Sequence, residues 1–202
     1  MSITTYAELK TAIADWTARS DLTSYLDDFI DLFEAHANRT LRCRQMETVT
    51  SLTPTSNVCT LPSDYIEYKR VVEDASTRRA LEYITEDAAD LLYPNRTAGL
   101  ACHFMIYGSS LMALPLSSND IELTYYQAVP ALSGSNTTNW LLTASPNAYL
   151  HGCLRYVAEF IKDNDMLAKE TALSQSYLEM LNAADNRAKF GNAGITITGT
   201  VW

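Results

Sequence analysis

The chain has 202 residues, 47% of them hydrophobic, and a formal net charge of −9 at pH 7. This length and apolar content suit one compact domain, or one domain with an insert, whereas the negative charge excludes DNA binding through a general positive field. No apolar run approaches the length of a membrane span, and the first residues, MSITTYAELK, lack the basic and apolar regions of a signal peptide, so we expect a protein that folds in a cytoplasm.

Two helices are predicted at the start of the chain. Thr5-Tyr6-Ala7-Glu8 fits a capping box, in which a hydroxyl and a carboxylate satisfy each other's backbone donors. We expect Asp21 to cap a second helix that ends near Leu41. The apolar residues of both helices recur at spacings of three and four, which is typical of helices with one buried face. They are Tyr6, Leu9, Ile13 and Trp16, then Leu22, Leu26, Phe29, Ile30, Phe33 and Ala37.

After Leu41 the helical period ends, and β-branched residues and turn signals appear. This change predicts a small, mainly antiparallel β domain of about six strands. Thr85 should begin a short helix that Pro94 ends. The alternation from Ile121 to Gln127 predicts a half-buried strand. The other expected strands are 46–52 and 58–61, interpreted as one hairpin, then 68–73 and 80–84, and a second hairpin formed by 102–107 and 111–114.

The stretch from Asn139 to Lys189 predicts two more helices. Ser145 should cap the first, and Pro146 fits the first helical turn, where its missing N–H costs nothing. We expect this helix to stop near Lys162 and the next to begin at once, so that the two lie antiparallel. The second helix has a predicted apolar side of Met166, Leu167, Leu173, Tyr177, Met180, Leu181 and Ala184. A core shared by both ends of the chain should contain Trp16, Phe29, Phe33, Leu154, Phe160 and Tyr177.

The predicted fold class is α+β, with a four-helix bundle built from both chain ends, an inserted β domain and an extended C-terminal tail. The expected boundaries are residues 1–41 and 139–190 for the bundle, 42–138 for the β-rich insert, and 191–202 for the tail. The tail, GNAGITITGTVW, is uncharged and prone to form a strand, and an unpaired strand of this kind would invite aggregation. It either pairs with the chain's own β domain or adds to another protein through Ile195, Ile197, Val201 and Trp202.

Basic residues cluster where the second helix meets the insert. Arg39, Arg42 and Arg44 either face an acidic partner subunit or form ion pairs with acids of the same chain.

Catalytic patterns are weak throughout the chain. His151 precedes Cys153 by two residues, and residues two apart on a helix do not face each other. The cysteines form no C-x-x-C pair, and the seven glycines form no phosphate-binding loop. Four acids near the start of the second helix, Asp27, Asp28, Asp31 and Glu34, are interpreted as a solvated face. We therefore expect no catalytic residue, no cofactor and no metal.

Several short sequence segments, in this order along the chain, make the sequence resemble the head-to-tail adaptor proteins of tailed phages. They span nearly the whole chain: Thr5-Tyr6-Ala7-Glu8-Leu9-Lys10, Phe29-Ile30-Asp31-Leu32-Phe33-Glu34-Ala35, Leu61-Pro62-Ser63-Asp64-Tyr65-Ile66-Glu67, Tyr125-Tyr126-Gln127-Ala128-Val129-Pro130, Asn139-Trp140-Leu141-Leu142 and Phe160-Ile161-Lys162-Asp163.

The resemblance implies a helical bundle with an inserted β domain, assembled as a ring, usually dodecameric, beneath the portal. Such a ring extends the DNA channel without sequence-specific binding and carries the tail nozzle or tail-tube protein. It implies a virion protein at the head-tail junction, assembled in the host cytoplasm, with no membrane partner. Two alternatives remain: a tail-completion or stopper protein, and a tail-associated hydrolase that uses Cys153 or His103.

Overall fold

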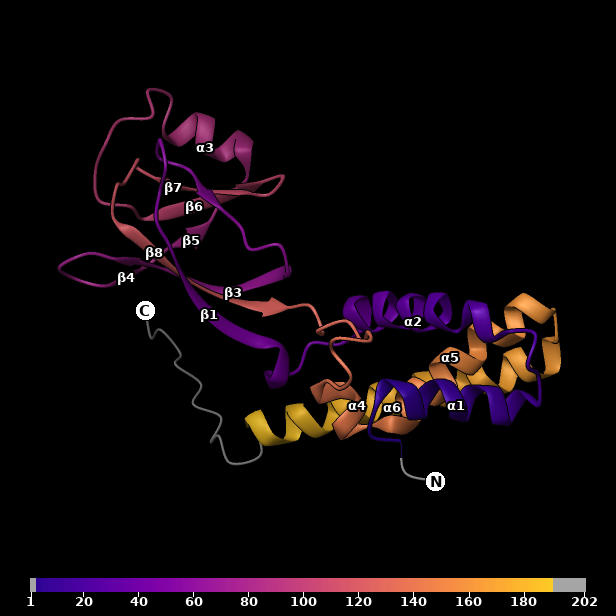
Figure 1. Cartoon of the computed structure of the whole chain (residues 1–202). Helices are drawn as coiled ribbons and strands as arrows, with labels where there is room; N and C mark the ends of the chain where they lie inside the picture. Colours follow the sequence, from indigo (N-terminus) through magenta and orange to yellow (C-terminus); the bar gives the residue numbers. More distant parts are fainter. Residues whose placement is uncertain (1–2, 191–202) are drawn as a thin grey trace. The chain divides into compact units, whose positions relative to one another are not determined.

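The computed structural model describes residues 3–190, and the predicted tail lies outside the described residues. The chain divides into two compact units, one formed by the residues up to Gln45 and from Val129 onward, the other by Met46–Ala128 (Figure 1). The first unit is helical and the second contains the strands, so the α+β class is confirmed.

The N-terminal helices of the helical unit are α1 (Tyr6–Thr17) and α2 (Leu26–Thr40). The capping box at Thr5 and Glu8 is confirmed. The prediction that Asp21 caps α2 is wrong, because the Asp21 carboxylate accepts hydrogen bonds from Arg19 and a 3-10 turn, Thr23–Tyr25, leads into α2 instead.

The C-terminal helices are α4 (Trp140–Ala144), α5 (Pro146–Ile161) and α6 (Asn164–Phe190). α5 begins at Pro146 as predicted, although the Ser145 side chain makes no capping hydrogen bond. Lys162 ends the helix in the left-handed conformation, with φ 61°. Asp163 then caps α6 by accepting a hydrogen bond from the Met166 amide at 3.0 Å.

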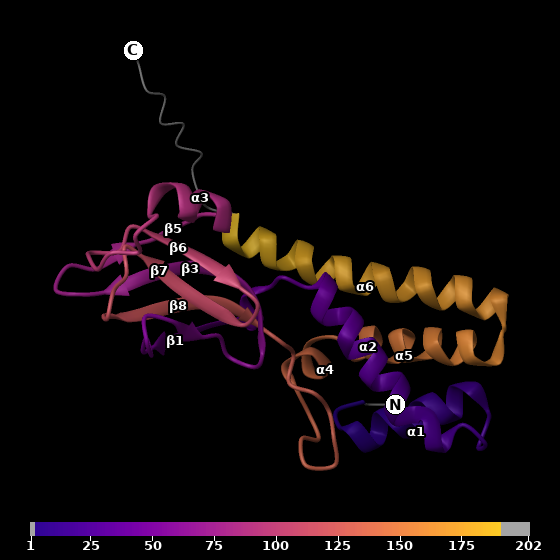
Figure 2. The same ribbon diagram turned by 90° about the horizontal axis from the view of Figure 1, so that it is seen from above.

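α5 is the central helix of this unit, because it packs against α1, α2, α4 and α6. Figure 2 shows α5 and α6 running side by side. The side chains of α5 that face its neighbours are buried, among them Tyr149, Cys153, Leu154 and Val157. A closed four-helix bundle made by α1, α2, α5 and α6 remains a prediction.

The predicted shared core is correct for Phe29, Phe33 and Leu154, which are buried. It is wrong for Trp16 and Phe160, whose exposed fractions are 54% and 49%. Both lie near helix ends, where a neighbouring helix contacts one side of each ring, His151 for Trp16 and Phe29 for Phe160, and leaves the rest exposed.

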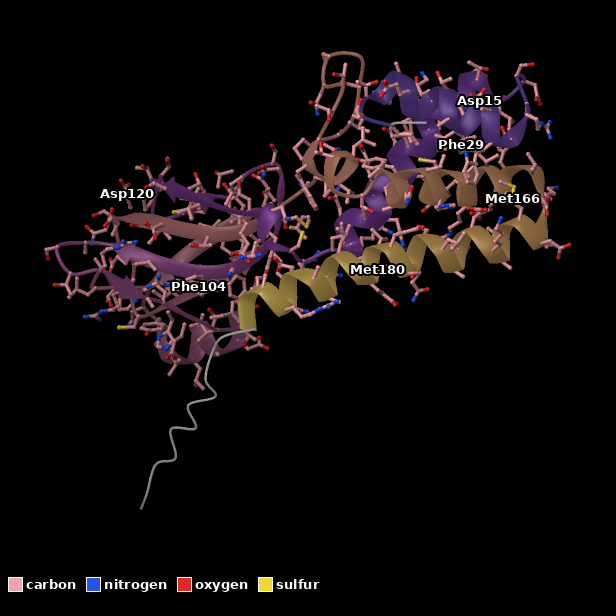
Figure 3. The ribbon with its side chains drawn as sticks, turned by 90° about the horizontal axis from the view of Figure 1, so that it is seen from below. Asp15, Phe29, Phe104, Asp120, Met166 and Met180 are labelled. Atoms are coloured by element: carbon pink, nitrogen blue, oxygen red, sulfur yellow. The ribbon has the colours of Figure 1, made fainter. Side chains whose placement is uncertain are left out.

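No residue on the predicted apolar side of α6 is fully buried: Tyr177 and four others are half-buried, whereas Met180 and Ala184 are exposed. The buried residues of α6 are Glu170, Ser174, Leu178 and Asp185, which follow one another at spacings of four, four and seven positions, and Met180 is 54% exposed (Figure 3). Polar side chains that find partners on α5 and on the segment after α2 therefore determine which face of α6 is buried.

The β unit contains two four-stranded sheets. The first, in the order β1-β8-β3-β4, is antiparallel; the second, in the order β2-β7-β6-β5, is antiparallel except for a parallel pairing of β5 with β6. A short helix, α3 (Glu86–Leu92), begins where it was predicted, and the Thr85 side chain caps it. The strands are β1 (Glu47–Leu52), β2 (Cys59–Thr60), β3 (Tyr65–Asp74), β4 (Arg79–Ala80), β5 (Glu82–Tyr83), β6 (His103–Tyr107), β7 (Ser110–Leu114) and β8 (Asp120–Gln127).

The two sheets share a core that includes Phe104, Leu111, Ile121 and Leu123 (Figure 3). The hairpin expected from 46–52 and 58–61 is wrong, because β1 pairs with β8 whereas β2 pairs with β7 in the other sheet. Its turn does close locally through a bridge between Thr55 and Val58, and the split places Cys59 in the core.

Candidate interaction surfaces

The arginine cluster connects the end of α2 to α6. The Arg42 amide donates a hydrogen bond to Asn182 Oδ1 at 3.2 Å, and its Nη1 donates to the Asn38 and Leu41 carbonyls at 2.9 and 2.6 Å. Arg44 Nε donates to Asp185 Oδ1 at 2.8 Å. Ion pairing within the chain, one of the two predicted alternatives, therefore holds for Arg44.

Asp185 is buried and pairs with two cations, because Lys189 Nζ approaches its other carboxylate oxygen at 2.8 Å. Burial favours the neutral acid, but the hydrogen bonds from Lys189 and Arg44 outweigh it and hold the pKa of Asp185 below its ordinary value. Arg39 lies apart from this pair, exposed in the last turn of α2.

We expect Arg44→Gln to lower the free energy of unfolding by about 1 kcal/mol at neutral pH, because Arg44 is half-exposed while its partner is buried. A carboxylate with a depressed pKa stabilises the fold above its unfolded pKa, about 3.9, and that stability disappears as the pH falls through the folded pKa. The difference between variant and wild type in urea titrations should therefore shrink between pH 7 and pH 3. Arg70→Gln, on an exposed position of β3, is the matched control, and an equal deficit at both pH values would contradict the assignment.

Aromatic rings of α1, α5 and α6 form a cluster in which Trp16 is exposed, Tyr177 half-buried and His151 buried. The ring of Trp16 meets that of His151 edge-on at 5.5 Å between centroids, and His151 stacks on Tyr177 at 5.5 Å. Beneath them, His151 Nδ1 lies 2.6 Å from Oε2 of the buried Glu170. This hydrogen bond fixes the imidazole, and with it the position against which Trp16 rests.

A second exposed aromatic group involves α2 and α5. Phe160 contacts Tyr25 and Phe29, with centroids 5.0 and 5.7 Å apart. Tyr25 is 43% exposed and Phe160 49%. Large aromatic side chains that remain partly exposed are enriched in protein interfaces. Helical periodicity could not separate these residues from the core, because they occupy the same apolar positions.

The β unit has its own exposed apolar residues. Leu91 and Leu92 at the end of α3 are 82% and 56% exposed, and Leu100 is 61% exposed. Leu91 and Leu92 are neighbours in the chain, and adjoining exposed apolar residues are candidates for an interaction surface.

Of the residues considered for catalysis, Cys153 lacks the properties of a nucleophile. Cys153 is fully buried, and burial, followed by the nearby Glu34 charge, raises the pKa of its thiol well above the ordinary value. His103 belongs to the β unit, where its Nδ1 lies 2.6 Å from the Tyr93 hydroxyl. Within residues 3–190, no group of three or more His, Cys, Asp or Glu side chains could hold a metal ion.

Two further findings concern the whole described part of the chain. None of its helices combines the length and the apolar character needed to cross a membrane. The predicted anchors Ile195, Ile197, Val201 and Trp202 lie outside the described residues, so their role stays a prediction.

Comparisons with known proteins agree with a structural role. No curated protein matches the chain. The model of one family, described as SU10 adaptor protein, matches residues 4–196, nearly the full length. The match includes both units. It agrees with the resemblance to head-to-tail adaptors that the short sequence segments indicate. The chain therefore belongs to the SU10 adaptor protein family, a family of phage structural adaptors.

Proposed function

We propose that this protein docks as a ring under the portal of a tailed phage, extends the DNA channel and provides the attachment platform for the tail. The observation that carries the proposal is the family match over residues 4–196. In this proposal the ring is dodecameric, lies at the head-tail junction of the virion, and carries a tail nozzle or tail-tube protein below. Assembly takes place in the host bacterial cytoplasm, from free subunits that are mostly monomeric.

In this proposal each predicted domain makes a different contact in the assembly. The four long helices act as one bundle from residues 1–41 and 139–190, and the exposed aromatic residues Trp16, Tyr25 and Phe160 supply contact surface. The β-rich insert, residues 42–138, offers the exposed leucines of α3 to the next tail protein. Both surfaces are typical of a protein that works inside an assembly.

Charge supports the passage of DNA. Each subunit carries a formal net charge of −9, and a ring multiplies that charge. An acidic channel repels the phosphate backbone, so DNA slides through it without sequence-specific binding.

The tail, residues 191–202, acts in this proposal as the docking arm. Its anchors Ile195, Ile197, Val201 and Trp202 add a strand to the portal or to a neighbouring subunit. Arg39, Arg42 and Arg44 contribute basic contacts, of which Arg39 is the most available because Arg44 already pairs with Asp185.

The test uses purified portal rings and two forms of the chain, full-length and truncated after Phe190. We expect the full-length chain to co-sediment with portal rings at a defined ring mass. The truncated chain should melt almost as the full-length chain does, because no described core residue is removed, and should fail to bind. The variant Trp202→Ala is the milder probe of the same contact.

Two results would contradict the proposal in different ways. Binding to isolated tails rather than to portal rings would favour a tail-completion or stopper protein. Unchanged portal binding by the truncated chain would keep the adaptor function and remove the tail as its docking arm.

A further inference from the structure

The first sheet of the β unit ends in a strand that is open to pairing. β1 (Glu47–Leu52) is the terminal strand in the order β1-β8-β3-β4, and Figure 2 shows it at the edge of the sheet beside β8. Among the described residues, no backbone hydrogen bond reaches β1 from any element other than β8. Apart from the Leu52 carbonyl, to which the Cys59 thiol donates at 3.8 Å, the backbone groups on its outer side are therefore available to another strand.

The other edge strands of the two sheets are much shorter. β4, β2 and β5 each contain two residues, whereas β1 contains six. Natural proteins usually protect a long edge with lysine, proline or a bulge, because an exposed edge can pair with a strand of another molecule. β1 has none of these, since its register with β8 is regular and its one charged residue, Glu47, stands first and pairs with Lys69. A long edge without such protection is typical of a strand that is covered in an assembly.

The two faces of β1 differ in burial. Thr48, Thr50 and Leu52 are half-buried on one face, and Leu52 packs against the core of the β unit. On the other face Val49 is 60% exposed and Ser51 is exposed as well. Because successive side chains of a strand point to opposite faces, a strand added to β1 should place apolar residues on the first face and small polar residues on the second.

The sequence of the tail, residues 191–202, has this pattern. Ile195 and Ile197 alternate with Thr196 and Thr198, so isoleucines that extend the core on the half-buried face leave the threonines on the exposed face. Neither the tail nor β1 after its first residue carries a charge, and pairing therefore brings no like charges together. The tail starts directly after α6 and spans about 40 Å when fully extended, so it can reach beyond its own helical unit.

We propose that β1 is the acceptor edge for the tail of a second copy of this chain, with Ile195 and Ile197 packed beside Leu52. Main-chain hydrogen bonds supply the affinity of such strand addition, and the alternating side chains fix its register. The tail of one copy and the β1 edge of the next are different surfaces, so the contact is head-to-tail and repeats until a ring closes.

This inference rests on the proposed function as a ring-forming adaptor. It names the neighbouring copy, rather than the portal, as the partner of the tail. In this arrangement a chain truncated after Phe190 fails on portal rings because separate subunits lose the avidity that a ring provides.

Disulfide trapping of two differently labelled full-length chains on portal rings tests the contact. The acceptor chain carries Val49→Cys, and the donor chain carries Thr196→Cys or Thr198→Cys, so that no proposed anchor is replaced. Both chains carry Cys102→Ser, since the other native cysteines are buried. At one of the two donor positions the mixed disulfide should form at least about tenfold more than with an Arg70→Cys acceptor, because a disulfide needs Cα atoms within about 7 Å. Arg70 is the matched control, exposed on β3, an inner strand of the same sheet.

Two changes in the donor chain separate strand pairing from chance collision. Ile197→Asp should abolish the excess, because it would bring an unpaired charge beside Leu52 and the core of the β unit. Ile197→Val keeps an apolar, β-branched side chain and should retain most of the excess. Circular dichroism of both variants checks that a lost excess reflects the contact and not unfolding.

Three results would overturn the proposal. One is a yield no higher than the control at both donor positions while the chains still co-sediment with portal rings, and another is an excess that Ile197→Asp leaves unchanged. The third is a disulfide that forms only within single chains carrying both Val49→Cys and Thr198→Cys, which would assign β1 to the chain's own tail. The adaptor function fails separately, by absence of binding of the full-length chain to portal rings. The same trapping in concentrated solution without portal then still decides whether β1 pairs with the tail of another copy.

Discussion

Gly152→Val should lower the free energy of unfolding by about 3 kcal/mol, because α2 and α5 approach each other so closely at this glycine that no side chain fits. A Cβ atom at Gly152 would lie 2.0 Å from Phe33 Cδ2 and 2.3 Å from Cε2. The Phe33 ring cannot move aside, since it is fully buried and meets the Tyr149 ring at 4.9 Å between centroids. A glycine inside a helix usually lowers stability by up to about 1 kcal/mol relative to alanine. The close contact with Phe33 explains why glycine is needed at this position.

Urea denaturation of the variant measures the effect, and Gly134→Val is the matched control. Gly134 lies in a loop of the same unit, and a Cβ there meets no atom within 4 Å, so its substitution should change stability by less than about 0.5 kcal/mol. Phe33→Ala added to Gly152→Val should cost less than the sum of the two single changes, because each relieves the other's defect. A wild-type midpoint for Gly152→Val would mean that α2 and α5 do not pack as described.

Local sequence signals predicted most of the secondary structure. The capping box at Thr5, the Pro146 start of α5 and the alternation from Ile121 to Leu123 and Tyr125 depend on neighbouring residues alone, and all are confirmed. The predicted hairpin between 46–52 and 58–61 failed because strand pairing depends on distant partners. β1 is extended as expected, but its register follows β8, about 75 residues later.

The interaction surfaces were harder to predict than the elements. Trp16 and Phe160 share the helical spacing of true core residues. They are half-exposed because they lie near the ends of their helices. On α6 the opposite happens, since Glu170 and Ser174 are buried although their residue types favour solvent. The burial of Glu170 depends on its partner His151, which lies on a different helix. Gly152 carried no sequence signal of its own, because the close contact appears only when α2 and α5 are placed together.

Glu34→Ala should destabilise the helical unit by about 3 kcal/mol, because it removes the acceptor of a buried hydrogen-bond network. Glu34 Oε1 accepts from the Leu132 amide at 2.9 Å and from the Tyr149 hydroxyl at 2.8 Å. The same hydroxyl accepts from Asn139 Nδ2 at 2.6 Å, and Asn139 also caps α4. Without the carboxylate, the Leu132 amide of the 129–139 loop and the Tyr149 hydroxyl of α5 remain buried and lose their acceptor.

Glu34→Gln is the decisive comparison. Both bonds reach the same oxygen, so a glutamine carbonyl can accept both, and we expect a change below about 1 kcal/mol near neutral pH. Burial raises the pKa of Glu34, although the hydrogen bonds from Leu132 and Tyr149 act against it. A raised folded-state pKa contributes stability that is fully present below the unfolded pKa, about 4.3, and is lost as the pH rises through the folded pKa. The glutamine variant has no proton to lose there, so in urea titrations from pH 4 to pH 7 its stability relative to wild type should increase with pH. Equal losses for Glu34→Ala and Glu34→Gln at pH 7 would show that the Oε1 acceptor does not hold the 129–139 loop to the helices.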